Sequence, residues 1–353
     1  MKSLPIPNLR RASARFKIIA RFGVWLGLFC VGSTSGLAQG SLTPPGAPAP
    51  TMKSLAQIEP RTDVSTLPGG AGFLHHITTS GSYYLTTNLT GVAALSGINI
   101  ATNNVTLDLN GFTLQGVAGS VNGISVQGAT TNITICNGAV SGWGSYGVSA
   151  LNASSRNLVF EQLNVSASGQ SGLFVYYSQV NRCNISTSGG YGIYAYYSEV
   201  RDCTVRSNSA SGIYADHSLV RGGHVDGNRD NGFYVITSTV SDCLVQNNSR
   251  SGIYVDGPGC VITENNCRGN NTGNYASNAG IYIRDSRNRV DGNHVIASGV
   301  SGIQVEAAYV NNVVIRNTVD GNGASNFVNP GGNDFGPVGV AATATSPWAN
   351  ISH

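Results

Sequence analysis

A motif of glycine, an apolar residue and an aromatic residue returns about every 20 residues through the middle of the chain. Three consecutive copies read GIY at 192–194, GIY at 212–214 and GFY at 232–234. Self-similarity at a period of about 20 to 50 residues is typical of solenoids, in which each repeat packs only on its neighbours. The glycines that open a unit are Gly123, Gly147, Gly172, Gly192, Gly212, Gly232, Gly252, Gly280 and Gly302.

Two kinds of solenoid have a period this short. The Val-x-x-Cys-x-Val-x-x-Asn spacing of residues 200–208 also occurs in leucine-rich repeats, which would place a helix in the opposite segment. That segment is GIYAYYS at 192–198, and its alternation has the period of two that is typical of a strand. We therefore predict an all-β, right-handed parallel β-helix over residues 71–325. Each coil would hold three short strands, with about 20 residues in the central coils.

The same alternation assigns side chains to the two sides of a strand. Ile193 and Ala195 are expected to point into the core, whereas Tyr194 and Tyr196 point outward. Asn208 is expected at a bend, where asparagines of successive coils can hydrogen-bond in a ladder. The glycine of each unit is expected to adopt a corner conformation that other residues resist.

Three cysteines, Cys183, Cys203 and Cys243, fall in one inward column. Residues stacked in parallel strands lie about 4.8 Å apart, whereas disulfide Cβ atoms lie about 3.8 Å apart. We therefore expect free thiols that pack as small core residues, with disulfides in an exported protein as the alternative. The remaining candidates, Cys136, Cys260 and Cys267, lack metal-ligand spacing, so no metal site is expected there.

Both ends of the chain differ from the repeats. In residues 1–38, six basic residues precede the apolar run GVWLGLFCVGSTSGLA, which predicts a signal peptide, with an uncleaved anchor as the alternative. The protein would then be exported to the periplasm, cell surface or medium, and the mature chain would not insert into a membrane. Residues 39–70 are expected to form a Pro/Gly-rich linker with a possible short helix at 52–59, and residues 326–353 a C-terminal tail or cap.

Charge limits the choice of partners. The 20 Lys and Arg residues fall to 14 once the six in the predicted signal peptide are removed, against 17 Asp and Glu. A mildly acidic mature chain has no basic face with which to neutralise phosphates, so nucleic acid is not an expected partner. We expect a monomer.

Six consecutive coils carry an aromatic residue at one outward position, and we call this column the aromatic ladder. Its members are Phe174, Tyr194, Tyr214, Tyr234, Tyr254 and Tyr282. A flat aromatic strip exceeds what a solvated face normally shows and is a surface on which sugar rings can lie. We therefore predict that the protein binds, and possibly cleaves, an extended polysaccharide there. The alternative is a non-catalytic structural or cell-surface adhesion solenoid, because stacked aromatics also stabilise parallel sheets.

A second outward column, the flanking column, runs two residues along. Its members are Tyr176, Tyr196, Asp216, Ile236, Asp256, Arg284 and Glu306. Tyr176 and Tyr196 extend the predicted sugar-binding surface. Asp216 and Asp256 would lie roughly 9–10 Å apart, near the upper end of the carboxylate separations of inverting glycosidases. The candidate catalytic residues are Asp216, Asp256, Arg284 and Glu306, with His217, Asp285 and His224 as candidate helpers; the alternative is an ordinary solvent-facing polar surface.

Several segments resemble exported bacterial right-handed parallel β-helix repeat proteins of the pectate-lyase-like superfamily. They are GSYYLTTNLTG, NVTLDLNGFTLQG, the Gly-Ile-x-Val coils, TPPGAPAPTMKSL and the terminal SPWANI. The resemblance covers nearly all of the mature chain and implies the fold, but it does not specify an activity.

The catalytic motifs of that superfamily have little counterpart in the sequence. Polygalacturonase-type hydrolases carry closely set aspartates with Gly-His-Gly and Arg-Ile-Lys, and this chain has only GGHVDG as a partial match. Calcium-dependent lyases need an acidic cluster beside an arginine base, and only Arg284 with Asp256, Asp285 and Glu306 is comparable. The resemblance therefore implies no cofactor, with Ca²⁺ expected only if the protein is a lyase. Lys53 is the one lysine of the mature chain, which excludes a lysine base within the coils.

Overall fold

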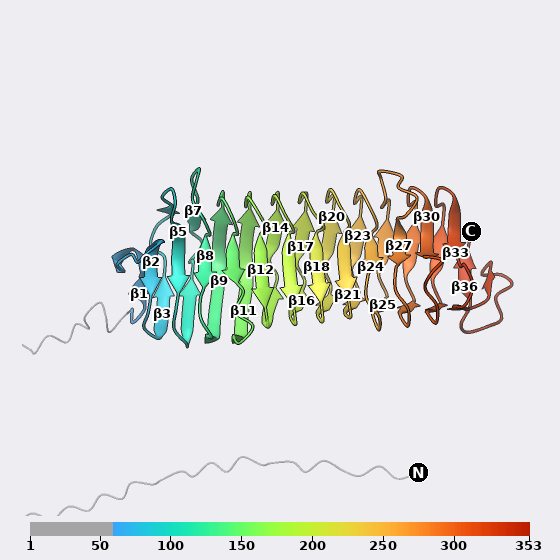
Figure 1. Ribbon diagram of the computed structural model, residues 1–353, viewed down its shortest axis with the longest axis horizontal. Helices are drawn as coiled ribbons and strands as arrows, with labels where there is room; N and C mark the ends of the chain where they lie inside the picture. The colour runs from blue at the N-terminus through green and yellow to red at the C-terminus, as the bar shows by residue number, and fades with distance from the viewer. Residues whose placement is uncertain (1–58) are drawn as a thin grey trace, which may run out of the picture. The chain divides into compact units, whose positions relative to one another are not determined.

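The structure is a computed structural model that describes residues 59–353, and these residues stack as successive coils of a parallel β-helix (Figure 1). One 12-stranded sheet receives a single strand from each coil. Its strands are β2 (Phe73–Ile77), β5 (Ser96–Ile100), β8 (Ile124–Val126), β10 (Val148–Ala150), β12 (Leu173–Tyr176), β15 (Ile193–Tyr196), β18 (Ile213–Asp216), β21 (Phe233–Ile236), β24 (Ile253–Val255), β27 (Ala279–Ile283), β30 (Ser301–Val305) and β33 (Ser325–Val328).

The remaining strands form two parallel rows, which are joined where β9 (Thr131–Ser141) and β11 (Arg156–Ser166) run through both. The first row also holds β1 (Thr62–Asp63), β3 (Gly81–Tyr84), β6 (Val105–Asp108), β13 (Ser178–Asn181), β16 (Glu199–Arg201), β19 (Leu219–Arg221), β22 (Thr239–Ser241), β25 (Val261–Thr263), β28 (Arg289–Asp291), β31 (Val313–Ile315) and β34 (Asp334–Phe335). The second row also holds β4 (Leu89–Thr90), β7 (Thr113–Gln115), β14 (Asn184–Ser186), β17 (Thr204–Arg206), β20 (His224–Asp226), β23 (Leu244–Gln246), β26 (Asn266–Arg268), β29 (His294–Ile296), β32 (Thr318–Asp320), β35 (Val338–Gly339) and β36 (Asn350–Ser352).

The predicted β-helix with three strands per coil is confirmed, and the leucine-rich alternative is wrong. Strands β18 and β19 occupy the segment between Asn208 and Val220, where that alternative required a helix. Within residues 59–353 the only helical element is a 3₁₀ turn at Val64–Thr66.

The coils extend beyond the predicted limits of 71 and 325 at both ends. Thr62 already pairs with Tyr83, and Val64 is fully buried in the core. At the other end Thr318 pairs with Ile351 of β36, so the expected C-terminal cap contributes strand pairing. The predicted signal peptide and most of the predicted linker, including residues 52–58 of the possible helix, lie outside the described residues.

Side chains alternate across the strands as predicted. Ile193 and Ala195 are fully buried, whereas Tyr194 and Tyr196 keep partial exposure on the outer side. The inward residues of successive coils form one continuous apolar core along the axis of the solenoid. Each coil packs only on its neighbours, so burial of this column of β-branched and aliphatic side chains provides most of the stabilisation of the fold.

The repeating glycines are required for space, and the expected corner conformation is wrong. Gly212 and the other glycines that open a unit do not have a positive φ. A Cβ at Gly212 would lie 2.6 Å from Cγ1 of Val225 and 2.8 Å from the carbonyl oxygen of Gly232. Many of the residues in the left-handed region lie instead just past strand ends, among them Tyr197 (φ 48°) and Thr237 (φ 43°). Glycine recurs because the backbone and core of the next coil leave no room for a side chain.

The predicted asparagine ladder is confirmed at the bends. The Nδ2 group of Asn208 donates to Oδ1 of Asn228 at 3.0 Å, and Asn228 donates in the same way to Asn248 at 3.0 Å. These side chains also accept hydrogen bonds from the backbone N–H groups of the preceding coil. The ladder therefore satisfies both backbone and side-chain polar groups in a fully buried position.

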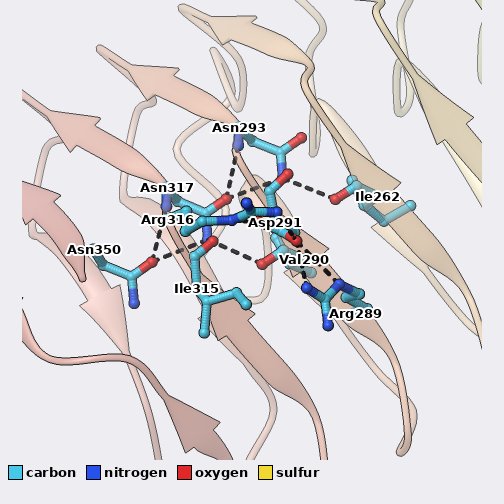
Figure 2. A network of polar contacts seen from close by, with 9 residues as sticks. All are labelled: Ile262, Arg289, Val290, Asp291, Asn293, Ile315, Arg316, Asn317 and Asn350. Carbon is cyan, nitrogen blue, oxygen red and sulfur yellow. Dashed lines mark hydrogen bonds and ion pairs between the residues drawn. The ribbon is translucent and has the colours of Figure 1, made fainter. Parts of the chain in front are cut away.

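A second asparagine ladder closes the C-terminal end of the solenoid (Figure 2). Asn293 donates to Asn317 at 3.0 Å, and Asn317 donates to Asn350 at 3.1 Å. The first rung of this ladder is Asn265, which donates to Asn293. Earlier in the chain the same corner holds cysteines, and the N–H of Cys243 donates to Oδ1 of Asn265 at 3.0 Å. The ladder therefore ties β36 to the preceding coils.

The inward cysteine column is confirmed. Cys183, Cys203 and Cys243 are 0%, 1% and 2% exposed and are free thiols in the structure. Burial raises the pKa of Cys243 to about 12, so this side chain stays a neutral thiol at neutral pH and is a weak nucleophile. The oxidation state of these three thiols in solution stays a prediction.

Candidate functional site

The aromatic ladder lies on the outer side of the 12-stranded sheet, as the sequence predicts. Consecutive members occupy directly paired positions, from Phe174 opposite Tyr194 to Tyr254 opposite Tyr282. They come from β12, β15, β18, β21, β24 and β27, which are stacked in this order in the 12-stranded sheet (Figure 1).

The rings stack face to face on one another. Centroids of Phe174 and Tyr194 lie 4.1 Å apart with planes 5° from parallel, and those of Tyr254 and Tyr282 lie 5.5 Å apart at 18°. Ring faces inside the ladder are therefore covered by neighbouring rings, whereas the face of Phe174 toward Ser149 has no stacked ring among the described residues. The ladder presents ring edges and phenol hydroxyls to the outside, which differs from the flat surface of ring faces that the sequence suggested.

Tyr282 does not belong to the exposed surface, which corrects its predicted role as an open sugar-binding residue. It is only 3% exposed, and burial raises its pKa to about 12. It follows the connection 269–278 between β26 and β27, which is longer than the corresponding connections of the preceding coils (Figure 1). The accessible part of the ladder therefore runs from Phe174 to Tyr254.

The phenol hydroxyls of the ladder are held in their protonated form. Burial raises the pKa of Tyr194, Tyr214 and Tyr254. The pKa of Tyr234 is raised by burial and by its hydrogen bond to the Asp256 carboxylate. A tyrosine hydroxyl is neutral at neutral pH even with its ordinary pKa of about 10, so the tyrosines of the ladder carry a row of neutral hydroxyl groups that can donate and accept hydrogen bonds.

The flanking column is also in register, but its candidate carboxylates belong to separate groups. Asp216 lies 2.6 Å from Nδ1 of His217, and Ile236 occupies the next rung. Asp256 accepts a hydrogen bond from Tyr234 and lies 3.7 Å from Arg284. The predicted pairing of Asp216 with Asp256 as one glycosidase site therefore has no shared polar network to support it.

Arg284 is the centre of the C-terminal group. Its Nε lies 3.3 Å from Oε2 of Glu306, and its Nη1 donates to the hydroxyl of Tyr254 at 3.3 Å. The pKa of Arg284 is raised above its ordinary value by the hydrogen bond with Tyr254 and by the charges of Asp256 and Glu306. A guanidinium in these surroundings stays protonated at neutral pH.

Two of the candidate helpers are not brought into these groups. His224 lies on β20, in the second row of the other sheet, so its proposed role beside the catalytic candidates is wrong. Asp285 accepts a hydrogen bond from the backbone N–H of Ser286 at 2.6 Å and makes no ion pair with Arg284. His217 is the one helper in contact with a candidate residue, through Asp216.

A further aromatic stack at the corner of the solenoid was missed from the sequence. The guanidinium carbon of Arg156 lies 3.9 Å from the ring centroid of Tyr177, which stacks on Tyr197 at 5.1 Å. Tyr197 in turn stacks on His217 at 4.6 Å. The Tyr-Tyr doublets at 176–177 and 196–197 were the available indication, because the second tyrosine of each repeats with the same period.

A hollow of about 560 Å³ lies on the 12-stranded sheet at the N-terminal end of the ladder. Its floor includes Ser125 and Ser149, which are paired with each other, and Ser149 is paired with Phe174. The column that carries large rings from Phe174 onward thus carries small polar residues just before it. Where the rings begin, Tyr146 packs edge-on against Phe174, with ring centroids 5.2 Å apart.

Within residues 59–353, no group of three or more His, Cys, Asp or Glu side chains is arranged to hold a metal ion. No helix among these residues is long and apolar enough to cross a membrane.

Comparisons with known proteins place the chain in a family. A family model described as the right handed beta helix region matches residues 96–239 and 217–336. Comparison with curated protein sequences gives no match.

Solved structures with a similar fold include the A-modules of the mannuronan C-5 epimerases AlgE6 and AlgE4 from Azotobacter vinelandii. The AlgE6 module is 17% identical with a TM-score of 0.57, and the AlgE4 module is 16% identical with a TM-score of 0.56. In both comparisons the match covers 83% of this chain and 88% of the module. Since the family model covers more than half of the sequence, the chain belongs to the right-handed β-helix family.

Proposed function

We propose that this protein binds an extended polysaccharide along the outer side of the 12-stranded sheet. The observation that carries the proposal is the row of neutral hydroxyls from Tyr194 to Tyr254, one per coil, with the polar hollow at Ser125 and Ser149 on the other side of the Phe174 rung. A polymer of repeating sugars offers hydroxyl groups at regular intervals along its length. A repeating row of donors and acceptors is suited to such a ligand.

The ligand would be recognised through hydroxyl groups and ring edges. Stacked neighbours cover the ring faces, so broad contacts between sugar rings and tyrosine faces are confined to the end of the ladder at Phe174, beside the hollow. Tyr176 and Tyr196 add a second pair of tyrosines in the flanking column, with centroids 5.1 Å apart. The structural relatives are named for mannuronan, itself a polysaccharide, which supports this class of ligand for the fold.

The geometry supports binding better than cleavage. Asp256 and Glu306 both neutralise Arg284, and Asp216 is engaged by His217. Hydrolysis by two carboxylates requires that one lies on each side of the same glycosidic bond. We therefore expect no release of reducing ends when the protein is incubated with a polysaccharide that it binds. Release that is abolished by Asp216→Asn or Asp256→Asn would contradict this expectation.

Replacing hydroxyls without removing rings tests the binding surface. The double variant Tyr214→Phe/Tyr234→Phe keeps the stacking and removes two central hydroxyls. We expect a small fall in Tm, from the lost hydrogen bond between Tyr234 and Asp256, and at least a tenfold loss of polysaccharide affinity, measured by affinity electrophoresis or calorimetry. The factor corresponds to about 1.4 kcal/mol, the size expected for one or two lost hydrogen bonds.

The corner stack provides the matched control. Tyr177→Phe/Tyr197→Phe removes the same two groups from another aromatic stack and is expected to leave affinity unchanged. Equal affinity of the ladder variant and the original protein would remove the aromatic ladder as the binding surface.

A structural role for the ladder is the second candidate, and the face-to-face stacking favours it. Aromatic pairs contribute about 0.5–1.5 kcal/mol each beyond their burial. If this is the whole role, Tyr214→Ala/Tyr234→Ala lowers the Tm and no polysaccharide in a binding screen responds to either double variant. If the surface binds a polymer, the same change lowers affinity much further than the phenylalanine variant does.

A further inference from the structure

The outer columns of the 12-stranded sheet carry an excess of negative charge. Over the described residues, the aromatic ladder and the flanking column contain three carboxylates, Asp216, Asp256 and Glu306. The one Lys or Arg in these columns is Arg284. The surface on which the proposed ligand lies therefore has two negative charges more than positive ones.

The positive charge of Arg284 is already used within the protein. It lies 3.7 Å from Asp256 on one side and 3.3 Å from Glu306 on the other. A carboxylate of a ligand would have to compete with both for the same guanidinium. Arginine binds carboxylates well only where its hydrogen-bonding edge is free.

The residues at the edge of the sheet opposite the flanking column, which precede its strands in sequence, change this balance of charges little. Arg250 lies 3.3 Å from Asp230 and 5.5 Å from the ring centroid of Tyr275. Arg229, exposed at the same corner, adds one positive charge. The carboxylates still outnumber the cations over the face and this edge together.

We propose, resting on the binding function proposed above, that the ligand is an uncharged polysaccharide and that polyuronates are disfavoured. Neutral sugar hydroxyls can donate to the carboxylates of Asp216 and Asp256 and exchange hydrogen bonds with the phenols of the ladder. A polyuronate would instead bring a carboxylate with every sugar onto a surface that already carries negative charge. Such like-charge contacts oppose binding.

A panel of soluble polymers tests this proposal at low ionic strength, where charge effects are largest. The neutral probes are galactomannan, arabinoxylan and mixed-linkage glucan, and the anionic probes are polygalacturonate and mannuronan. We expect at least one neutral polymer to bind at least tenfold more tightly than either polyuronate. Its binding should weaken in Tyr214→Phe/Tyr234→Phe and change little between low and high salt.

Each other outcome has a definite meaning. Tighter binding of a polyuronate that is lost in the tyrosine variant would keep the binding function and overturn the proposed selectivity. Absence of binding by every polymer would overturn the binding function and the selectivity together. Binding that the tyrosine variant leaves unchanged would place the ligand on another face and refute both.

A charge-neutralisation experiment tests the cause directly. In Asp256→Asn/Glu306→Gln the guanidinium of Arg284 loses both partners and the column loses two negative charges. We expect affinity for polygalacturonate to rise at least tenfold. The matched control Asp226→Asn/Asp320→Asn removes the same charge from the second strand row and is expected to leave it unchanged. An equal rise in both variants would show that only net charge matters and would refute a role for Arg284.

Discussion

At the scale of single residues, Asp291 shows how one buried charge joins neighbouring coils. It is 3% exposed and accepts hydrogen bonds from Nη2 of Arg289 at 2.6 Å and from Nε and Nη2 of Arg316, both at 2.6 Å (Figure 2). Arg289 is on the same strand, and Arg316 directly follows β31, the strand of the next coil that pairs with β28. The carboxylate therefore links two coils close to the C-terminal end of the solenoid.

These contacts predict a specific pH dependence. The hydrogen bond from Arg316, reinforced by Arg289, lowers the pKa of Asp291. A carboxyl whose folded pKa is below its unfolded value of about 3.9 stabilises the fold fully above that value. The stabilisation is lost as pH falls through the lower, folded pKa. Asp291→Asn should cost about 2 kcal/mol at neutral pH, the size of a lost charged hydrogen bond, and should flatten the acid limb of stability against pH.

Urea unfolding at a series of pH values measures this effect. Asp320→Asn, which removes an exposed carboxylate of the second strand row, is the matched control and should keep the acid limb of the original protein. Parallel acid limbs for all three proteins would contradict the role of Asp291.

At the scale of elements, the short strands depend on the ladders at their corners. Asn228 accepts from the N–H and Nδ2 groups of Asn208 and donates to Asn248, all at 3.0 Å. It is fully buried, so removal of its amide leaves polar groups of two other coils without partners. A corner ladder of this kind holds three coils in register at once.

Truncation of one rung should therefore be costly. Asn228→Ala is expected to lower the free energy of unfolding by about 2–4 kcal/mol, since several buried hydrogen-bonding groups lose their partners. Asn184→Ala provides the control, because Asn184 hydrogen-bonds to Asn164 on the exposed surface and its loss should cost less than about 0.5 kcal/mol. Denaturant unfolding compares the two, and equal costs would mean that burial of the ladder is unimportant.

At the scale of the whole solenoid, the ends are the exposed parts of an otherwise repeating core. Asn350 accepts from the N–H and Nδ2 groups of Asn317, and Phe335 pairs with Val314. These residues cover the last coil, whose strand edges would otherwise be open to pairing with another chain.

Deletion of residues 334–353 tests this capping role. We expect a lower Tm by circular dichroism and association of the shortened protein by light scattering, because the last apolar coil and its strand edges become exposed. The single change Asn350→Ala should lower the Tm less and leave the protein unassociated. A shortened protein with the original Tm and no association would show that the C-terminal segment is dispensable.

The sequence alone was sufficient for the fold and for the positions of the columns predicted from it, although it missed the corner stack of Tyr177 and Tyr197. A period of about 20 residues fixes which residues stack, and alternation within each strand fixes which of them face the core, so Ile193, Tyr194 and Asn208 could be placed correctly. Both properties follow from local backbone geometry and need no knowledge of distant contacts.

Only the tertiary structure decided how neighbouring side chains meet. Stacking turned the ring faces of the ladder toward each other, the connection 269–278 accompanies the burial of Tyr282, and Arg284 joined Asp256 to Glu306. The glycines proved to be required by the next coil and not by their own φ. These outcomes depend on rotamers and loop paths, which the spacing of residues along the chain leaves open. Periodicity therefore determined which residues lie side by side, whereas packing between coils determined which of their atoms remain available to a ligand.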